Sequence, residues 1–266
     1  MSAPGVLQYR SLIWNFAQRD LKSRFKGTAI GWTWSLLLPL TTLAVYTLVG
    51  KLFNIPPARF ADGRPGNFAV WLVVGLTAWG FFANAVNVSM GALLGSGTLL
   101  QKIYFPSFAP VVGAVIGVVI QSAIEVGLVL VALVFFSNVG VTWLLLPVWI
   151  AVFILFTTSA ALLFAIGNIY FRDLAHIVAV VLQLLFYATP ILYPDTIGPL
   201  VKHPLLHNLI LCNPMTDFVL LFRDLVYGLD PGRLNIWAGA LGWTAFMFGF
   251  AMFVFNRYGR DLAEQM

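Results

Sequence analysis

The chain has 266 residues, of which 60% are hydrophobic and only 9% are charged, whereas ordinary soluble domains carry about 25% charged residues. The charged residues lie in short strips between long apolar runs, which excludes a separate soluble domain. In a soluble protein, a net charge of +5 would suggest nucleic-acid binding. Here the basic residues lie beside apolar runs, where interaction with anionic lipid headgroups explains them. We therefore predict an all-α membrane protein surrounded by membrane lipid, with no nucleic acid partner.

Residues 1–30 predict a cytoplasmic amphipathic helix. Its apolar positions recur at the spacing of one helical face, namely Tyr9, Leu12, Ile13 and Phe16. A different face is basic and carries Arg19, Lys22 and Lys26. Such a helix lies in the membrane interface with its apolar face in the lipid surface. It is either a surface anchor alone or an anchor that also frames an entrance at the cytoplasmic surface.

Six apolar runs are long enough to be transmembrane helices, because a hydrocarbon core of about 30 Å requires about 20 residues. They are Gly31–Leu52, Phe68–Val88, Ser107–Phe136, Val141–Tyr170, Leu174–Leu192 and Asn235–Phe255. The fourth run is either one span or a shorter, broken one. Together these runs form one transmembrane domain, residues 31–256, followed by a cytoplasmic tail, residues 257–266.

The basic residues set the expected orientation. With the N-terminus inside, the inner strips hold nine of the 15 Lys and Arg residues: Arg10, Arg19, Lys22, Arg24, Lys26, Lys102, Arg172, Arg257 and Arg260. An even number of spans then returns the C-terminus to the same side. The expected localisation is the cytoplasmic (inner) membrane, multi-pass, with both termini cytoplasmic.

The segment between the fifth and sixth spans, about residues 194–230, is rich in proline. Its apolar stretches, Leu205–Leu211 and Phe218–Val226, are each too short to cross a bilayer. Short re-entrant helices occur at membrane depth only where protein or a water-filled cavity satisfies their backbone groups. We therefore expect re-entrant helices that gate a cavity near the outer face, the alternative being a surface loop with amphipathic turns.

Glu125 is the clear ionisable residue inside the spans. A buried carboxyl group is expected to face other helices and form an interhelical hydrogen bond, or to be protonated. One such group without a charged partner in a neighbouring span gives little support to an ion-coupled carrier.

No catalytic or metal site is expected. His176, His203, His207 and Cys212 lack metal-ligand companions or a catalytic base at recognisable spacing. The chain also lacks the GxxxxGK[ST] loop that holds nucleotide phosphates. It is therefore either a passive pore or a subunit whose partner hydrolyses ATP.

The polar strips together resemble one family. The first is Arg19-Asp20-Leu21-Lys22, Arg24-Phe25-Lys26, Gly31, Trp34 and Pro39, and the later ones are Lys102–Pro106, Tyr170–Leu174, Thr189–Pro194, Asn213-Pro214-Met215 and Arg223-Asp224. This order is similar to that of permease subunits of type-2 ABC exporters for polysaccharides, which export O-antigen, teichoic acid or capsule. Ser107 departs from the pattern, because the family often carries a basic residue there.

The resemblance implies a homodimer of this chain joined to two ATP-binding subunits that hold ATP and Mg²⁺, with no cofactor on this chain. Gly97–Phe105 would then be a coupling helix in a groove of the ATPase, with Gln101, Lys102, Tyr104 and Phe105 as contacts. Arg172 and Asp173 would contribute from the next inner turn, or form a solvated pair at headgroup level. An outer gate would include Asn213, Arg223 and Asp224.

The resemblance also places the first and fifth spans around a pore. Aromatic candidates to line this pore are Trp32, Trp34, Tyr46, Phe186, Tyr187 and Tyr193. Aromatic faces can stack on sugar rings without binding one hydroxyl pattern, although lipid-facing packing is the alternative for each residue. Trp71, Trp143, Trp149 and Trp237 are expected in the interfacial aromatic belts.

The function implied is export of a lipid-linked polysaccharide. Its pyrophosphate head would meet the basic face of Arg19, Lys22 and Lys26. The alternatives are a type-2 ABC exporter of a small drug or lipid, an ion-coupled carrier or pore, and, most distantly, a membrane enzyme.

Overall fold

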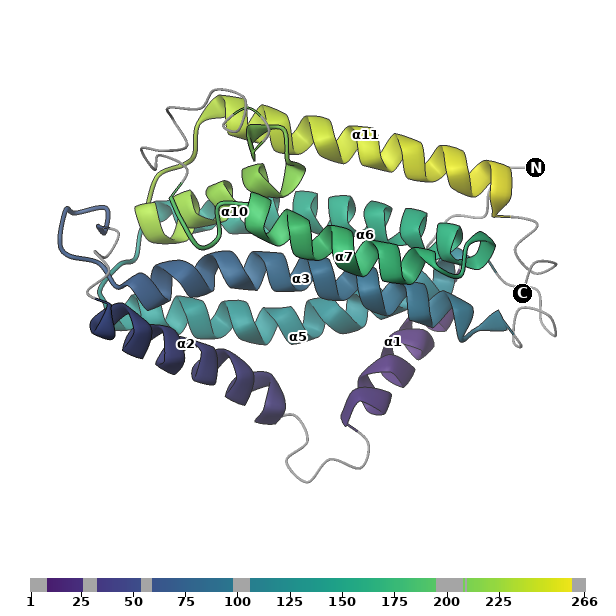
Figure 1. Ribbon diagram of the computed structural model, residues 1–266, viewed down its shortest axis with the longest axis horizontal. Helices are drawn as coiled ribbons and strands as arrows, with labels where there is room; N and C mark the ends of the chain where they lie inside the picture. The colour runs from purple at the N-terminus through teal and green to yellow at the C-terminus, as the bar shows by residue number, and fades with distance from the viewer. Residues whose placement is uncertain are drawn as a thin grey trace.

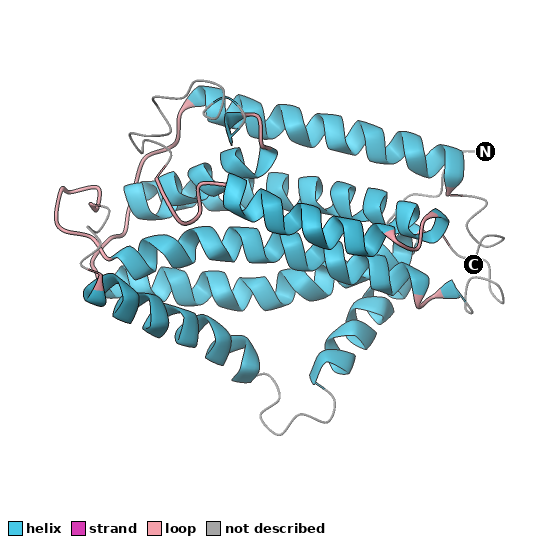
Figure 2. Ribbon diagram, viewed as in Figure 1, coloured by secondary structure: helices cyan, strands magenta, loops and turns pink. Residues whose placement is uncertain are grey.

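A computed structural model describes residues 9–25, 33–53, 59–97, 106–194, 208 and 210–259. The regular structure of these ranges is helical throughout, which confirms the predicted all-α class (Figure 2). The main helices are α1 (Arg10–Phe25), α2 (Trp34–Leu52), α3 (Phe68–Leu94), α5 (Phe108–Phe135), α6 (Leu146–Tyr170), α7 (Leu174–Ala188), α10 (Pro214–Arg223) and α11 (Leu234–Tyr258). A 3-10 turn, Val141–Leu145, precedes α6, and a π-helical turn, Asp224–Gly228, follows α10.

Most of the helices run along the long axis of the molecule (Figure 1). The centre is α3, which packs against both α5 and α6. Outside this central group, α11 packs on α6, α1 packs on α5, and α2 packs on α3 and α5. The short helix α10 contacts α3, α6 and α11, so it is enclosed by long helices rather than lying on the surface.

Four described segments are long and apolar enough to cross a membrane, which agrees with four of the six predicted spans. They are Phe68–Leu94, Phe108–Phe135, Val141–Tyr170 and Leu234–Tyr258. The remaining two predicted spans correspond to α2, with 19 residues, and to α7, a shorter apolar helix of 15 residues. The broad division into apolar helices was therefore predictable from hydropathy and length.

Helix α7 ends earlier than predicted. The apolar run continues to Leu192, but the helix stops at Ala188 and Thr189 is extended, with φ −92° and ψ 136°. Pro190 explains this difference, because the proline ring disfavours a helical conformation at the preceding residue. At 1.5 Å per residue, α7 is about 22 Å long, shorter than a hydrocarbon core of about 30 Å.

Two glycines allow α1 to approach α5 closely. A methyl group at Gly113 would lie 2.5 Å from Phe16 Cβ, 3.0 Å from the Ile13 carbonyl oxygen and 3.1 Å from the Ala17 nitrogen. One turn later, a methyl group at Gly117 would lie 2.5 Å from a carboxylate oxygen of Asp20. The main chain of α1 therefore lies against α5 in a space that only glycine leaves open.

This packing changes the interpretation of the N-terminal helix. The helix itself is confirmed, but Ile13 and Phe16 are buried within the protein. The prediction that these two side chains enter the lipid surface is wrong, because α5 covers them. Among the described side chains of α1, Trp14 is an exposed apolar one.

Trp149 is also placed differently from the prediction. Its side chain is only 3% exposed, it stacks on Phe222 with ring centroids 4.5 Å apart, and its indole N–H donates to the Phe218 carbonyl 3.2 Å away. The prediction of an interfacial aromatic belt at this position is wrong because α10 covers the ring. Trp149 instead joins α6 to α10 in the core.

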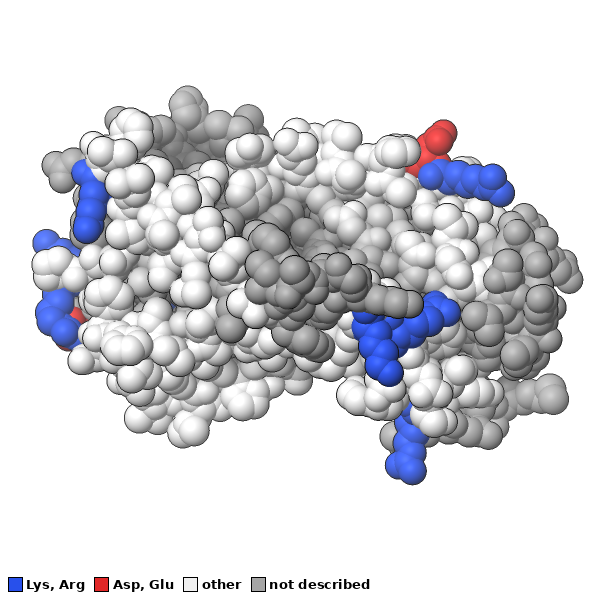
Figure 3. Space-filling view, turned by 90° about the horizontal axis from the view of Figure 1, so that it is seen from below, with Lys and Arg blue, Asp and Glu red and all other residues white. Residues whose placement is uncertain are grey.

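The charged side chains fall into separate groups along the molecule. On the face shown in Figure 3, some Lys and Arg side chains lie at one end and others lie between the middle and the opposite end, with a broad, mostly uncharged stretch between the two groups. We call the end where α3 and α6 finish the inner end, and the end where they begin the outer end, after the sequence prediction. The separation is the distribution that a membrane-spanning bundle requires.

Candidate functional site

The inner end brings together strips that are far apart in the sequence. The Ser107 hydroxyl donates to the Gly259 carbonyl 3.3 Å away, and the Tyr170 hydroxyl donates to the Tyr258 carbonyl 3.4 Å away. These contacts join the beginning of α5 and the end of α6 to the end of α11. The predicted inner strips at these positions therefore share one end of the bundle.

The basic face of α1 lies near this end. Arg19 donates to the Ser96 hydroxyl 3.4 Å away, and its guanidinium lies 5.0 Å from the ring centre of Phe16. The side chains of Arg19 and Lys22 are both exposed, so they are available to an anionic group. Lys26, the third residue predicted for the entrance, lies outside the described residues.

The turn between α6 and α7 also belongs to the inner end. Arg172 and Asp173 are exposed there. The Asn168 side-chain oxygen accepts a hydrogen bond from the Ala175 N–H at 3.1 Å, which fixes the turn. The predicted contacts Gln101, Lys102, Tyr104 and Phe105 lie outside the described residues. The turn thus presents two charged side chains on a defined backbone.

Three of the predicted pore aromatics lie together near the outer end of α7. The rings of Phe186 and Tyr187 are 5.3 Å apart, and Phe186 meets Trp79 of α3 at 5.7 Å. The Tyr193 hydroxyl donates to the Tyr187 carbonyl 2.9 Å away. Partial burial raises the pKa of the Tyr193 hydroxyl, so this donor stays protonated. Tyr187 is 58% exposed and presents its ring to the surroundings of the chain.

The remaining pore candidates are on or before α2. Tyr46 is half-buried on α2, Trp34 begins that helix, and Trp32 lies outside the described residues. Helix α2 packs on α3 and α5, and α7 packs on α3 and α6, so both helices contact α3. The structure brings together Phe186, Tyr187 and Tyr193, whereas Tyr46 lies on a different helix.

Asn213, predicted in the outer gate, is buried at the start of α10. Its side-chain oxygen accepts from the Met215 N–H at 3.0 Å and caps the helix. Its amide nitrogen donates to the Thr189 hydroxyl 2.8 Å away, just after α7. One side chain therefore joins the beginning of α10 to the end of α7.

Arg223, at the other end of α10, is only 5% exposed. Its guanidinium donates to the Pro190 carbonyl, to the Ile191 carbonyl at 2.6 Å and to the Trp71 carbonyl at 3.3 Å. The same group lies 3.6 Å from the ring centre of Trp71. We call these four contacts the Arg223 clasp. Arg223 is thus a buried link, and Asp224 follows it, half-buried, in the π-helical turn.

Sequence reasoning missed two members of this arrangement. Trp71 was expected only as an interfacial residue, yet its ring and carbonyl both contact Arg223. A methyl group at Gly75, one turn along α3, would lie 2.5 Å from an Arg223 nitrogen, so glycine leaves the space that the guanidinium fills. In the sequence, a glycine one turn after a tryptophan indicates only that something packs closely against this face of α3. The fold is required to identify that group as the Arg223 side chain.

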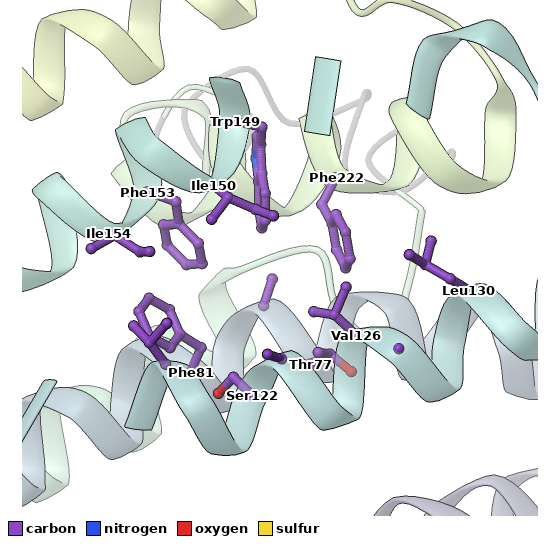
Figure 4. A pocket seen from close by; sticks show the side chains of 14 residues that line it. Thr77, Phe81, Ser122, Val126, Leu130, Trp149, Ile150, Phe153, Ile154 and Phe222 are labelled. Carbon is purple, nitrogen blue, oxygen red and sulfur yellow. The ribbon is translucent and has the colours of Figure 1, made fainter. Parts of the chain in front are cut away.

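An apolar cavity of about 230 Å³ lies between α3, α5, α6 and α10. Figure 4 shows Trp149 and Phe222 on one side of it and Val126 and Thr77 on the other. Its lining is hydrocarbon and aromatic except for the hydroxyls of Thr77 and Ser122. Such a lining suits an apolar group and offers few of the hydrogen bonds that a sugar requires.

Glu125 lines a second apolar cavity, of about 220 Å³, with residues of α2, α3 and α5. Its carboxyl group has a hydrogen bond with Gln121, one turn earlier on α5. This partner is on the same helix, whereas the sequence favoured an interhelical one. No group of three or more His, Cys, Asp or Glu side chains that could hold a metal ion occurs in the described part of the chain.

Comparison with known proteins identifies the family. Residues 11–227 match the ABC-2 type transporter family. The chain is 31% identical over 228 residues to the O-antigen export system permease protein RfbA of Myxococcus xanthus, covering 84% of this chain and 82% of the relative. It is 30% identical over 226 residues to a protein of the same name from Klebsiella pneumoniae, covering 82% and 79%. The chain therefore belongs to the ABC-2 type transporter family.

Proposed function

We propose that this chain is the permease subunit of an ATP-driven ABC transporter that exports a lipid-linked polysaccharide across the cytoplasmic membrane. The observation that carries the proposal is the similarity to O-antigen export permeases over more than four fifths of both chains. The four long apolar helices and the clustering of the inner strips agree with it. The chain is a membrane subunit, and the ATP hydrolysis belongs to a separate partner.

The proposed topology has six spans, with α2 and α7 added to the four long apolar helices. Helix α1 lies at the cytoplasmic surface, and α10 belongs to a re-entrant segment between the fifth and sixth spans. The burial of α10 among α3, α6 and α11 supports this, because a re-entrant helix requires protein around its backbone ends. Residues 1–30 and 257–266 are then cytoplasmic, and residues 31–256 form the transmembrane domain.

The proposed assembly contains two copies of this chain and two ATP-binding subunits that carry ATP and Mg²⁺. The large exposed apolar side chains of α7, such as Val180, Leu184 and Tyr187, require a cover of lipid or protein. A second copy would supply part of that cover and complete a pore. The ATP-binding subunits would meet the inner end, at Arg172, Asp173 and the strip that includes Gln101, Lys102, Tyr104 and Phe105.

The polysaccharide would enter at the basic face of α1 and pass the aromatic side chains of α7. The exposure of Arg19 and Lys22 suits a pyrophosphate-bearing lipid head. The open ring of Tyr187 suits stacking on successive sugars, because a π-face does not select one hydroxyl pattern. The polymer would then leave past the segment that holds Asn213 and Arg223.

The alternative is a type-2 ABC exporter of a small drug or lipid. The cavities between the helices, of about 230 and 220 Å³, are smaller than the about 300–1,000 Å³ of drug-sized sites, but an open hollow of about 470 Å³ beside Gly239 and Trp243 on α11 is not, so cavity size does not separate the two functions. An exporter of a small lipid through a shared dimer pore would have the same inner strips, and cargo measurements separate it from a polysaccharide exporter.

A purified sample of this chain alone is expected to hydrolyse no ATP, because the sequence lacks a phosphate-binding loop. Affinity purification from its own membranes in mild detergent should recover an ATP-binding subunit, and that complex should hydrolyse ATP. The measurement is phosphate release by the chain, by the complex and by a complex purified with Arg172→Ala and Asp173→Ala substitutions. ATPase activity in the chain alone, or recovery without any nucleotide-binding partner, would contradict the proposal.

A further inference from the structure

Helix α7 is held firmly at its outer end and lightly along its length. Val178 and Leu182 are its buried residues, whereas Thr189, Pro190 and Ile191, directly after it, are all buried. Because burial restricts movement more than exposure does, the outer end is the better-fixed part of this element within the chain.

Both ends of α10 hold that same three-residue segment. At the start of α10, Asn213 donates to Thr189. At its end, Arg223 donates to the carbonyls of Pro190 and Ile191. These carbonyls follow the last helical residue of α7, where acceptors lack partners within the helix. Movement of the outer end of α7 away from α10 would therefore break hydrogen bonds at two separate points.

Arg223 is suited to this link by its chemistry. A guanidinium presents several N–H donors in one plane, so a single side chain can serve carbonyls of two elements. Burying it is costly unless those donors are used, and withdrawal of the carbonyls would leave a buried cation with fewer partners. The clasp is consequently cooperative, because breaking one of its contacts weakens the others. The relative positions of α3, α10 and the outer end of α7 therefore change together.

We propose that Arg223 is a positioning residue that makes the outer end of α7 and α10 move as one body during transport. The proposal rests on the proposed function, because it assigns the clasp a part in export, but its geometry can be tested without cargo. In this role Arg223 acts through the backbone of residues 190 and 191, and so through the placement of Tyr187 and Tyr193.

The test measures the separation of α7 and α10 by electron paramagnetic resonance. Spin labels are attached to the native Cys212, which is exposed just before α10, and to Leu184→Cys on the exposed face of α7. The complex with its ATP-binding partner is placed in lipid nanodiscs, with and without ATP. The wild-type distance distribution should be narrow and the same in both states, whereas Arg223→Gln should broaden it and make it depend on ATP.

Two reference measurements make the result specific. A label pair at Cys212 and Leu241→Cys, on α11, should be unaffected by Arg223→Gln, since the clasp does not include α11. The same exchange at exposed Arg59 should leave both distributions unchanged. A distribution for Arg223→Gln that matches the wild type would overturn the proposal.

A second variant displaces the guanidinium while keeping the arginine. Gly75→Ala places a methyl group 2.5 Å from the Arg223 nitrogen and should broaden the α7–α10 distribution, whereas Gly80→Ala, with open space around it, should not. If Arg223→Gln does not fold, Gly75→Ala decides the question by the same criterion. If the complex hydrolyses no ATP and moves no glycan, the proposed function fails, while the width of the α7–α10 distribution measured without ATP still tests the clasp.

Export provides the functional measurement. Arg223→Gln should slow polysaccharide export at least about tenfold, as expected for the loss of charge-assisted hydrogen bonds. Arg223→Lys should restore part of the rate, because it returns the charge without the planar fork. Equal export by Arg223→Gln and the wild type would contradict the assigned role.

Discussion

Replacing Gly113 by alanine is expected to detach α1 from α5 and to lower the free energy of unfolding by about 3 kcal/mol, the upper range for overpacking. The new methyl group would meet main-chain atoms of Ile13 and Ala17, which cannot turn away as a side chain can. Chemical denaturation in bicelles measures the change. Because α1 carries Arg19 and Lys22, export should fall in parallel.

The same helix offers matched controls. Gly117→Ala meets the end of the Asp20 side chain, which can move, and Gly127→Ala meets nothing within 4 Å. The expected order of destabilisation is therefore Gly113, then Gly117, then Gly127, with no loss at the last. Equal effects at all three positions would show that helix propensity, not contact with α1, controls the outcome.

Trp149→Ala is expected to destabilise the protein by about 3–5 kcal/mol, the usual cost of deleting a large buried aromatic side chain. The substitution removes the stack on Phe222, removes the indole hydrogen bond to the Phe218 carbonyl and enlarges the neighbouring cavity. Thermal unfolding of the purified protein, followed by fluorescence or circular dichroism, measures the loss.

Two further variants separate the contributions of the indole. Trp149→Phe keeps an aromatic ring but removes the N–H, so it should cost about 1 kcal/mol, the net value of one hydrogen bond. Trp14→Ala, at a side chain that is 48% exposed, should change stability by less than about 0.5 kcal/mol. A Trp149→Ala effect no larger than that of Trp14→Ala would mean that α10 is not held by this ring.

Hydropathy and length predicted the four long apolar helices because a bilayer imposes a strong requirement on every helix that crosses it. The start of α3 at Phe68 agrees with the prediction, and Asn67 supports it by accepting hydrogen bonds from the Ala69 and Val70 N–H groups. The apolar run predicts a longer α7 than the structure has, because the helix ends before Pro190 although the run continues. Hydropathy indicates whether a segment lies in lipid or in water, whereas a proline indicates where its helix can end.

The placement of α1 could not be predicted from its own amphipathic pattern. An apolar helical face is compatible with lipid and with another helix, and Ile13 and Phe16 do not distinguish them. The spacing of Gly113 and Gly117 was the informative signal, since a GxxxG pattern allows close approach of helices in membranes. The pattern predicts that a helix packs closely against Gly113 and Gly117, but it does not predict that this helix is α1.

The roles assigned to the candidate site residues stay predictions, but the structure does bring some of these residues together. Phe186, Tyr187 and Tyr193 lie together as an aromatic group, and Asn213 and Arg223 lie at the two ends of one short helix. The burial of Arg223 was not predictable, because it depends on two residues of α3 that are distant in the sequence. Trp71 precedes Arg223 by 152 residues (223 − 71) and Gly75 precedes it by 148 (223 − 75). Long-range polar contacts of this kind leave no periodic pattern in a single sequence.

Transport in proteoliposomes tests the central claim most directly. The chain is reconstituted with its ATP-binding partner, and lipid-linked polysaccharide from the native membranes is supplied on the side of the ATP-binding subunits. We expect glycan to reach the opposite side only when the chain, the partner and ATP are all present. Movement of glycan by the chain alone, or none by the complete complex with ATP, would contradict the account.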